Sequence, residues 1–240
     1  MLENAKYFPL GEDGILFVIG NEINIEENRI IWNIARRIKD LQIKEIKEIV
    51  PAYSSLAIFY KPESIKYEQI RNLIENIVNS SENLDKEEES FQRNIVIPVC
   101  YGEDFSPDLD IVTEICSIKK EEFIEIHSSK IYRVFMLGFS PGFPYMGILD
   151  ERIQVPRRET PRIKIPPGSV GIAEKQTGIY PVETAGGWRI IGRAPLKIFD
   201  LNQENPFLLS PGDNVKFKPI DSQAYSRIEK GEKEWMLYES

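Results

Sequence analysis

Histidine and cysteine are scarce in this sequence. It contains one histidine, His127, and two cysteines, Cys100 and Cys116. Zinc sites are built mainly from these residue types, so a zinc cluster cannot be assembled. A carboxylate site for magnesium is the alternative, but it has no signature here, so no metal site is assigned. Two cysteines do not make a disulfide framework, and both stand among apolar residues. We therefore expect small buried thiols in a reduced, cytoplasmic protein.

Long apolar runs and a surplus of basic residues are also missing. No run approaches the ~20 residues that span a bilayer, and the opening stretch MLENAKYFPLGEDG lacks the basic-then-apolar order of a signal peptide. The formal net charge is −8, whereas binding to many phosphates requires a local excess of Lys and Arg. The sequence therefore predicts neither a nucleic-acid partner nor a membrane partner.

The first third of the chain has the pattern of a small α+β domain. Residues 6–11 and 14–20 are typical of strands, and residues 24–41 place apolar side chains at helical spacing. Two more strands are expected at 48–53 and 55–61, followed by a helix at 67–78. Because strand, strand and helix occur twice, residues 1–80 are predicted to form an antiparallel sheet with helices on one face.

An acidic stretch separates this region from a second domain. Between Glu82 and Glu89 there are five acids and one lysine, a composition that cannot bury apolar surface. Residues 81–92 are therefore predicted to be a linker, and residues 93–240 a second domain. That domain is expected to open with a strand at 93–102, two short helices at 108–129 and a strand at 130–137.

The remainder of the chain is typical of a β-barrel. Residues 138–192 hold nine of the 15 glycines and seven of the 16 prolines, which favours short strands joined by tight turns. Strand-length segments follow one another at 168–173, 178–184, 187–194, 196–201 and 213–220. The expected fold is thus an N-terminal α+β domain followed by a mainly-β barrel domain.

Residues 138–142, Gly-Phe-Ser-Pro-Gly, match the G-x-S-x-G spelling of many serine hydrolases. In those enzymes the residue after the serine donates its N–H to the oxyanion, but Pro141 has no N–H. The partner histidine should also follow the serine, whereas His127 precedes it. The segment is therefore predicted to be a rigid turn whose aromatic residues belong either to a packed barrel corner or to the wall of a ligand or partner groove. These residues are Phe139, Phe143 and Tyr145.

A basic loop, residues 152–171, is unusual in so acidic a protein. It carries five positive charges against one acid, Glu159, on a backbone stiffened by four prolines. Guanidinium groups on an ordered backbone suit the bidentate capture of a carboxylate or phosphate. The alternative is a solvated surface that makes ion pairs with the protein's own acids.

Several further residues are candidates for a ligand site. Gln176, with Thr177 and Tyr180, offers neutral hydrogen-bonding groups that could orient a polar ligand. Trp188 suits either the core or a subunit interface. His127 is either structural or, as the only imidazole, a group for proton transfer.

Three long segments carry a family resemblance: GFSPGFPYMGILD, VPRRETPRIKIPPGSVGIA and QTGIYPVETAGGWRIIGRAPLKIFD. They closely resemble the family of the 5-oxoprolinase B subunit, also called KipI or allophanate hydrolase subunit 1. GEDGILFVIG and EIVPAYSSLAIFY extend the likeness over nearly the full chain. The resemblance implies that the barrel is cyclophilin-like, although prolyl isomerase activity does not follow from the fold.

The resemblance also implies an activity and partners. Together with the C subunit (allophanate hydrolase subunit 2-like) and the A subunit, such a chain would belong to a 5-oxoprolinase that uses ATP, with Mg, to open 5-oxo-L-proline to L-glutamate. It would be inactive alone. In this interpretation His127 assists proton transfer, whereas the anion or substrate is held and oriented by Arg158, Arg162, Gln176, Tyr180 and Arg193.

Two other roles follow from the same resemblance. KipI-type proteins inhibit a sporulation sensor histidine kinase, and the groove wall of Phe139, Phe143, Tyr145 and Trp188 would then be a docking surface for that partner. A role related to allophanate hydrolysis is the third. The motifs do not distinguish between these roles because all three share the same framework.

Overall fold

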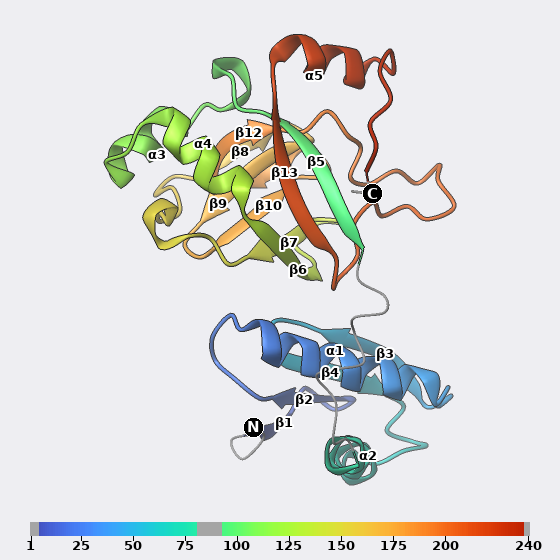
Figure 1. The fold of residues 1–240 in the computed structure, drawn as a ribbon. Helices are drawn as coiled ribbons and strands as arrows, with labels where there is room; N and C mark the ends of the chain where they lie inside the picture. Colours follow the sequence, from blue (N-terminus) through green and yellow to red (C-terminus); the bar gives the residue numbers. More distant parts are fainter. Residues whose placement is uncertain (1–4, 81–92, 238–240) are drawn as a thin grey trace. The chain divides into compact units, whose positions relative to one another are not determined.

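The computed structural model describes residues 5–80 and 93–237. The chain divides into two compact units, Met1–Phe91 and Gln92–Ser240, and Figure 1 shows the elements of each. The predicted linker, residues 81–92, lies outside the described residues.

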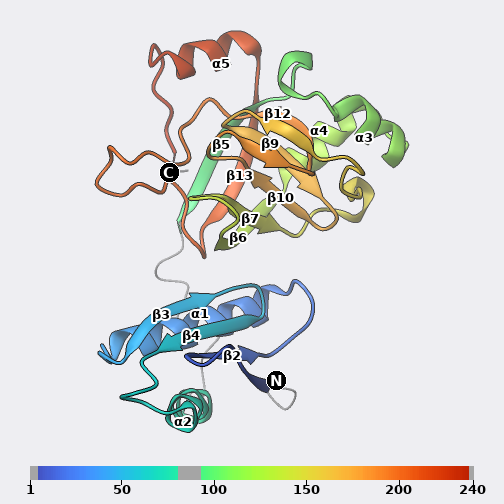
Figure 2. The same ribbon diagram turned by 180° about the vertical axis from the view of Figure 1, so that it is seen from behind.

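Unit 1 is a four-stranded antiparallel sheet with two helices. The strand order is β1-β2-β4-β3. In chain order the elements are β1 (Lys6–Pro9), β2 (Gly14–Val18), α1 (Ile25–Asp40), β3 (Ile46–Pro51), β4 (Ser55–Tyr60) and α2 (Tyr67–Asn79). Helix α1 lies in front of the sheet in Figure 1 and behind it in Figure 2, so it covers one face.

Alternating apolar residues build the core of unit 1. In the register of β2 and β4, Ile15 faces Ile58 and Phe17 faces Leu56, and all four side chains are buried. Because alternate residues of a strand point to opposite faces, these side chains form one apolar surface. The apolar stripes of α1 and α2 join the same core.

Unit 2 is built around a closed barrel of seven strands. The barrel strands are β5 (Asn94–Cys100), β6 (Ile131–Leu137), β7 (Pro144–Gly147), β9 (Ser169–Ala173), β10 (Gln176–Ile179), β12 (Arg189–Arg193) and β13 (Asn214–Ile220). They are ordered β10-β7-β6-β13-β5-β12-β9, and β9 pairs with β10 to close the ring. The predicted mainly-β barrel is confirmed.

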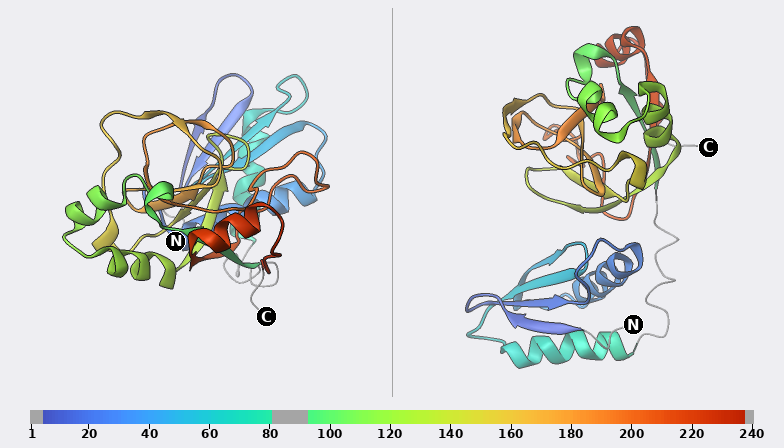
Figure 3. Two further views of the ribbon diagram at one scale, coloured as in Figure 1. Left: turned by 90° about the horizontal axis from the view of Figure 1, so that it is seen from above. Right: turned by 90° about the vertical axis from the view of Figure 1, so that its left-hand side faces the viewer.

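The barrel interior is filled by strand and helix residues together. Helices α3 (Leu109–Cys116) and α4 (Lys120–Ser129) lie side by side in Figure 3 and pack on the barrel. Val112 of α3 and Phe123 of α4 join Val134, Ile172 and Val215 of the strands in one buried cluster. Helix α5 (Ser222–Glu229) follows β13 directly.

The structure differs from the predicted strands in several places. The segment 178–184 is divided: β10 ends at Ile179, and β11 (Thr184–Gly186) pairs instead with β8 (Arg162–Ile165) in a small separate sheet. Residues 196–201 form only an isolated bridge between Phe199 and Phe207. Strands β7 and β8 and helix α5 were not predicted, because short segments rich in proline or charge give weak periodic signals.

Candidate anion-binding site

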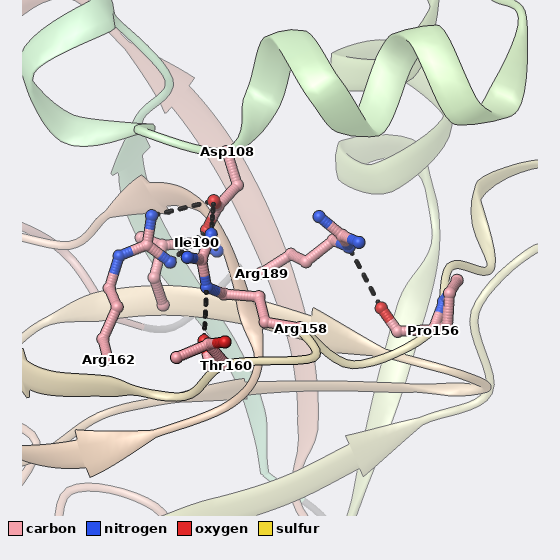
Figure 4. Close-up of polar contacts among 7 residues, drawn as sticks. All are labelled: Asp108, Pro156, Arg158, Thr160, Arg162, Arg189 and Ile190. Carbon is pink, nitrogen blue, oxygen red and sulfur yellow. Dashed lines mark hydrogen bonds and ion pairs between the residues drawn. The ribbon is translucent and has the colours of Figure 1, made fainter.

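A buried carboxylate, Asp108, gathers the predicted arginines. Asp108 directly precedes α3, whereas Arg162 opens β8 and Arg158 lies four residues before it. Arg162 donates from Nη1 to Asp108 Oδ2 at 2.6 Å and from Nη2 to Oδ1 at 2.8 Å. Arg158 donates from Nη1 to Oδ1 at 2.9 Å. Figure 4 shows both guanidinium groups converging on this one carboxylate.

The backbone of β12 completes the surroundings of Asp108. The amide of Ile190 donates to Asp108 Oδ2 at 2.6 Å, and the amide of Asp108 donates to the Ile190 carbonyl at 3.0 Å. The Asp108 side chain is 2% exposed, so its charge is compensated by these donors rather than by water. Removing one partner from such a buried pair is strongly unfavourable because it leaves an uncompensated charge.

The basic loop is tied to the barrel by backbone contacts. The amide of Arg158 donates to the Gly187 carbonyl at 2.8 Å, and Arg189 Nε donates to the Pro156 carbonyl at 3.0 Å. In Figure 4 the Arg189 side chain points toward Pro156, away from the other two arginines. Arg158 Nε donates to the Thr160 carbonyl at 3.3 Å. The prolines and these bonds hold the arginines in a fixed geometry.

The arginine pair, defined as Arg158 and Arg162, keeps part of its hydrogen-bonding capacity. Their side chains are 30% and 23% exposed. Within residues 5–80 and 93–237, no acceptor is bonded to Arg158 Nη2 or Arg162 Nε. Of the two alternatives for the basic loop, the internal ion pair is therefore present, and it occupies only some of the guanidinium N–H groups.

Sequence reasoning missed Asp108. The helix begins at Leu109, and its N-cap residue is Asp108, not the nearby Ser106. The Ser106 hydroxyl donates instead to the carbonyls of Tyr101 and Gly102. Asp108 makes no side-chain cap hydrogen bond. A single acid before a helix is so common that only its partners, 50 and 54 residues away, reveal its role.

The predicted aromatic wall is a closed cluster. Phe143, Tyr180 and Trp188 are 2%, 2% and 4% exposed, and the Phe143 ring lies 5.1 Å from Tyr180 and 5.4 Å from Trp188, edge to face. Tyr145 packs 4.9 Å from Phe143. Phe143 and Trp188 are therefore not accessible to a partner, because the other rings and β8 cover them.

Phe139 is the exception within this predicted wall. It is 62% exposed, and its backbone adopts a positive φ of 61°, an uncommon conformation for a bulky residue. It borders a hollow that is also lined by Leu137, Ser140, Pro141 and Phe207. The barrel-corner interpretation thus describes Phe143, whereas Phe139 presents its ring to the solvent.

In the described part of the chain, the other predicted ligand residues are not among the groups bonded to Asp108. Gln176 is 7% exposed. Burial raises the pKa of Tyr180 to about 12, so its hydroxyl stays neutral. The Arg193 guanidinium carbon lies 5.6 Å above the centre of the Phe105 ring, and its buried Nε has no acceptor among the described residues.

His127 lies in the barrel core with no exposed surface. Its Nδ1 is 2.8 Å from the Tyr101 hydroxyl, and its Nε2 is 3.2 Å from Thr177 Oγ1. Burial lowers its pKa to about 3, so the ring is neutral at physiological pH. This environment does not support the predicted role in proton transfer, because no substrate can reach the ring.

The Gly-Phe-Ser-Pro-Gly segment is a tight turn between β6 and β7. The Ser140 amide donates to the Gly138 carbonyl at 2.6 Å, and the Phe143 amide donates to the Ser140 carbonyl at 3.0 Å. The imidazole that a serine nucleophile would need is bonded to Tyr101 and Thr177 instead. This geometry agrees with the interpretation of the motif as a structural turn.

Neither a metal cluster nor a membrane helix is found in the part of the chain that the structure describes. No three His, Cys, Asp or Glu side chains there are grouped so that they could hold a metal ion. No helix in the same residues is long and apolar enough to cross a bilayer.

Comparisons with known proteins give consistent results. Residues 5–209 match the family described as carboxyltransferase domain, subdomain C and D. The chain is 40% identical to the 5-oxoprolinase B subunit of Bacillus subtilis (strain 168) over 227 residues, which cover 90% of this chain and 93% of that protein. It is 37% identical to the 5-oxoprolinase B subunit of Escherichia coli O157:H7 over 219 residues, covering 91% and 97%.

A solved structure resembles the fold over most of this chain. The crystal structure of the protein TTHA0988 matches with a TM-score of 0.77 at 30% identity. The match covers 87% of this chain but only 40% of that one, so this chain spans less than half of the longer solved protein.

Proposed function

Because the chain belongs to the 5-oxoprolinase B-subunit group of the carboxyltransferase-domain family (subdomains C and D), we propose that it is the B subunit of an ATP-dependent 5-oxoprolinase. Together with the C and A subunits, it takes part in opening 5-oxo-L-proline to L-glutamate. The observation that carries this proposal is the end-to-end similarity to the two bacterial B subunits, which leaves no large part of either protein unmatched.

The occurrence of this fold within a longer solved protein supports a partner polypeptide for this chain. In the longer solved protein, the matching region is less than half of one chain. Two domains that are covalently joined in one protein can be separate chains in a second protein, where they bind each other non-covalently. We therefore propose that this chain is inactive alone and works in a complex with the C and A subunits.

The arginine pair is the part of this chain that suits the substrate. 5-Oxo-L-proline carries one carboxylate, and guanidinium N–H groups bind carboxylates with defined geometry. Anchoring that carboxylate would fix the position of the ring amide, whose C–N bond is broken in the reaction. We assign this role to Arg158 and Arg162 and not to Gln176 or Tyr180, because those side chains are almost completely buried.

The described residues show no recognisable signature of a site for ATP and Mg. These residues offer no cluster of acids for the metal. The glycine-rich turn has Ile148 and Leu149 where a phosphate-binding loop requires Lys and Ser or Thr. We propose that one of the other polypeptides, or a surface shared between polypeptides, holds ATP and Mg.

Co-expression with the C and A subunits tests the proposal. The purified complex should release glutamate from 5-oxo-L-proline only when ATP is present, and omission of this chain should abolish the release. Arg162→Ala should lower the rate at least about tenfold, because anchoring of the carboxylate is lost. Arg152→Ala is the matched control, since Arg152 pairs with Asp150 and is 60% exposed. Glutamate release that does not depend on this chain would contradict the proposal.

Inhibition of a sensor histidine kinase is a second candidate function. The observation that favours it is the exposed ring of Phe139 beside a hollow of the barrel, because exposed aromatic residues often anchor protein interfaces. Autophosphorylation of candidate kinases should fall when this chain is added, and Phe139→Ala should restore it. No inhibition at a micromolar excess of the chain would rule out this candidate.

A further inference from the structure

We propose that Asp108 is a positioning residue that turns the arginine pair into a site for a monoanionic carboxylate. This inference deepens the proposed function, on which it rests for the role of the pair. It concerns a residue to which neither the sequence motifs nor the family resemblance gave a role. The juxtaposition that carries it is one buried carboxylate bonded to two partly exposed guanidiniums.

Asp108 fixes the orientation of both guanidiniums. Arg162 directs two N–H groups to its two oxygens, which defines the plane of the Arg162 guanidinium. Arg158 is held at two points, by Asp108 Oδ1 and by the Thr160 carbonyl. Free arginine side chains must lose rotamer freedom when they bind a ligand. Here that ordering is achieved during folding, before any ligand arrives.

Some N–H groups of the arginine pair are not bonded to Asp108 or to the Thr160 carbonyl and are available to a ligand. Arg162 Nε and Arg158 Nη2 have no bonded acceptor within residues 5–80 and 93–237, and neither atom is buried. Each belongs to a guanidinium that is bonded to Asp108 through other nitrogens. A carboxylate could accept from either of these nitrogens without displacing Asp108.

The charge of the site favours a single negative charge. Two guanidiniums and one carboxylate leave a net charge of about +1 on these three side chains. Of the neighbouring cations, Lys164 is paired with Glu183 at 2.9 Å, whereas Arg189 Nε donates to the Pro156 carbonyl. A phosphate dianion would leave excess negative charge beside the buried Asp108. A carboxylate monoanion would not.

Nuclear magnetic resonance on the isotopically labelled full-length chain tests this inference without the other polypeptides of the complex. The arginine Nε–H signals are followed while sodium acetate or sodium sulfate is added at constant ionic strength. We expect acetate to shift the Arg162 Nε–H signal saturably and to bind at least as tightly as sulfate. The Nε–H signal of Arg152, whose guanidinium is bonded to Asp150, is the matched control and should not saturate.

Two variants distinguish a positioning role of Asp108 from a purely structural role. In Asp108→Asn the charge of the site rises by one, so the ratio of acetate to sulfate affinity should fall by about tenfold or more. If this variant does not fold, Arg162→Lys keeps the charge but loses the planar fork. It should abolish the saturable response of Arg158 to acetate, whereas Arg152→Lys should preserve it.

Three results with the isolated chain would overturn the inference: equal responses of Arg162 and Arg152, tighter binding of sulfate than of acetate to the unaltered chain, or an unchanged affinity ratio in folded Asp108→Asn. Protection of the pair by the C subunit without any response to acetate would identify a partner's acid as the occupant and would overturn it too. A saturable acetate response together with an inactive complex would uphold the carboxylate site and reject the proposed function.

Discussion

Single buried polar side chains determine where charge can lie in unit 2. The buried Asp108 carboxylate accepts hydrogen bonds from two guanidiniums and a backbone amide. Among the described residues, the groups around His127 are neutral: the Tyr101 and Thr177 hydroxyls and the rings of Phe123, Tyr132 and Phe217. A charged imidazole would have no compensating partner there, so burial lowers its pKa to about 3.

Because the pKa of His127 is lower in the folded chain than in the unfolded chain, we expect His127 to make the free energy of unfolding fall at acidic pH. Its pKa in the unfolded chain is about 6.5, so the unfolded state binds a proton that the folded state does not bind until the pH approaches 3. The stability that His127 contributes is therefore fully present above pH ~6.5 and is lost as the pH falls below it, by up to ~1.4 kcal/mol per pH unit.

Urea unfolding of the unaltered chain and of His127→Gln between pH 7 and pH 5 measures this contribution. Glutamine can keep hydrogen bonds to the two hydroxyls but does not titrate. The free energy of unfolding of the variant should depend less on pH than that of the unaltered chain. Equal pH dependence in the two proteins would show that His127 is not the source.

Close packing between elements restricts the residues at strand crossings. In β10, Gly178 pairs with Gly171 of β9 on one side and with Tyr145 of β7 on the other. A Cβ at Gly178 would lie 2.8 Å from both Phe143 Cζ and the Pro144 carbonyl oxygen. The aromatic cluster over the barrel can thus approach β10 only because this position has no side chain.

Gly178→Ala should therefore destabilise unit 2 by about 1–3 kcal/mol, because the added methyl group overlaps with a buried ring and a backbone oxygen. Gly187→Ala is the matched control: its new Cβ would have no neighbour closer than 3.8 Å. It should change stability by less than ~0.5 kcal/mol. Thermal unfolding of both variants measures the difference, and equal melting temperatures would contradict the packing argument.

On the scale of the whole molecule, each unit has its own core. Among the residues that the structure describes, the buried members of the apolar cluster of unit 1 lie between Ile15 and Ile77, and those of the clusters of unit 2 lie between Ile95 and Phe217. The C-terminal residues also remain within unit 2: Trp235 Nε1 donates to the Val96 carbonyl, and the Leu237 carbonyl accepts from the Val96 amide.

Residues 92–240 should consequently fold when they are produced alone. The isolated unit should give dispersed amide signals and unfold cooperatively, because the barrel closes and its core fills without any residue of unit 1. Removal of residues 235–240 from this unit should lower its stability, since Val96 loses both bonds. An unfolded isolated unit would show that unit 1 contributes to the barrel core.

The predictable parts of the fold are those with strong local patterns. The helical spacing of apolar residues in 24–41 and 67–78 located α1 and α2, and the concentration of glycine and proline predicted the barrel. The small sheet of β8 and β11 was not predictable, because its strands are three or four residues long and belong to segments that also carry charge and proline. Such short strands form only where a distant partner supplies hydrogen bonds.

The sequence by itself determined the composition of the candidate site: the scarcity of metal ligands, the excess of arginine on a proline-stiffened loop, and the absence of an oxyanion donor after Ser140. Only the tertiary structure decided which of these charged groups can still bind a ligand. Asp108 stands far from Arg158 and Arg162 in the chain, and pairing of β12 with β9 brings Ile190 to the same carboxylate. Burial and charge compensation depend on neighbours in space, and a local sequence pattern does not contain them.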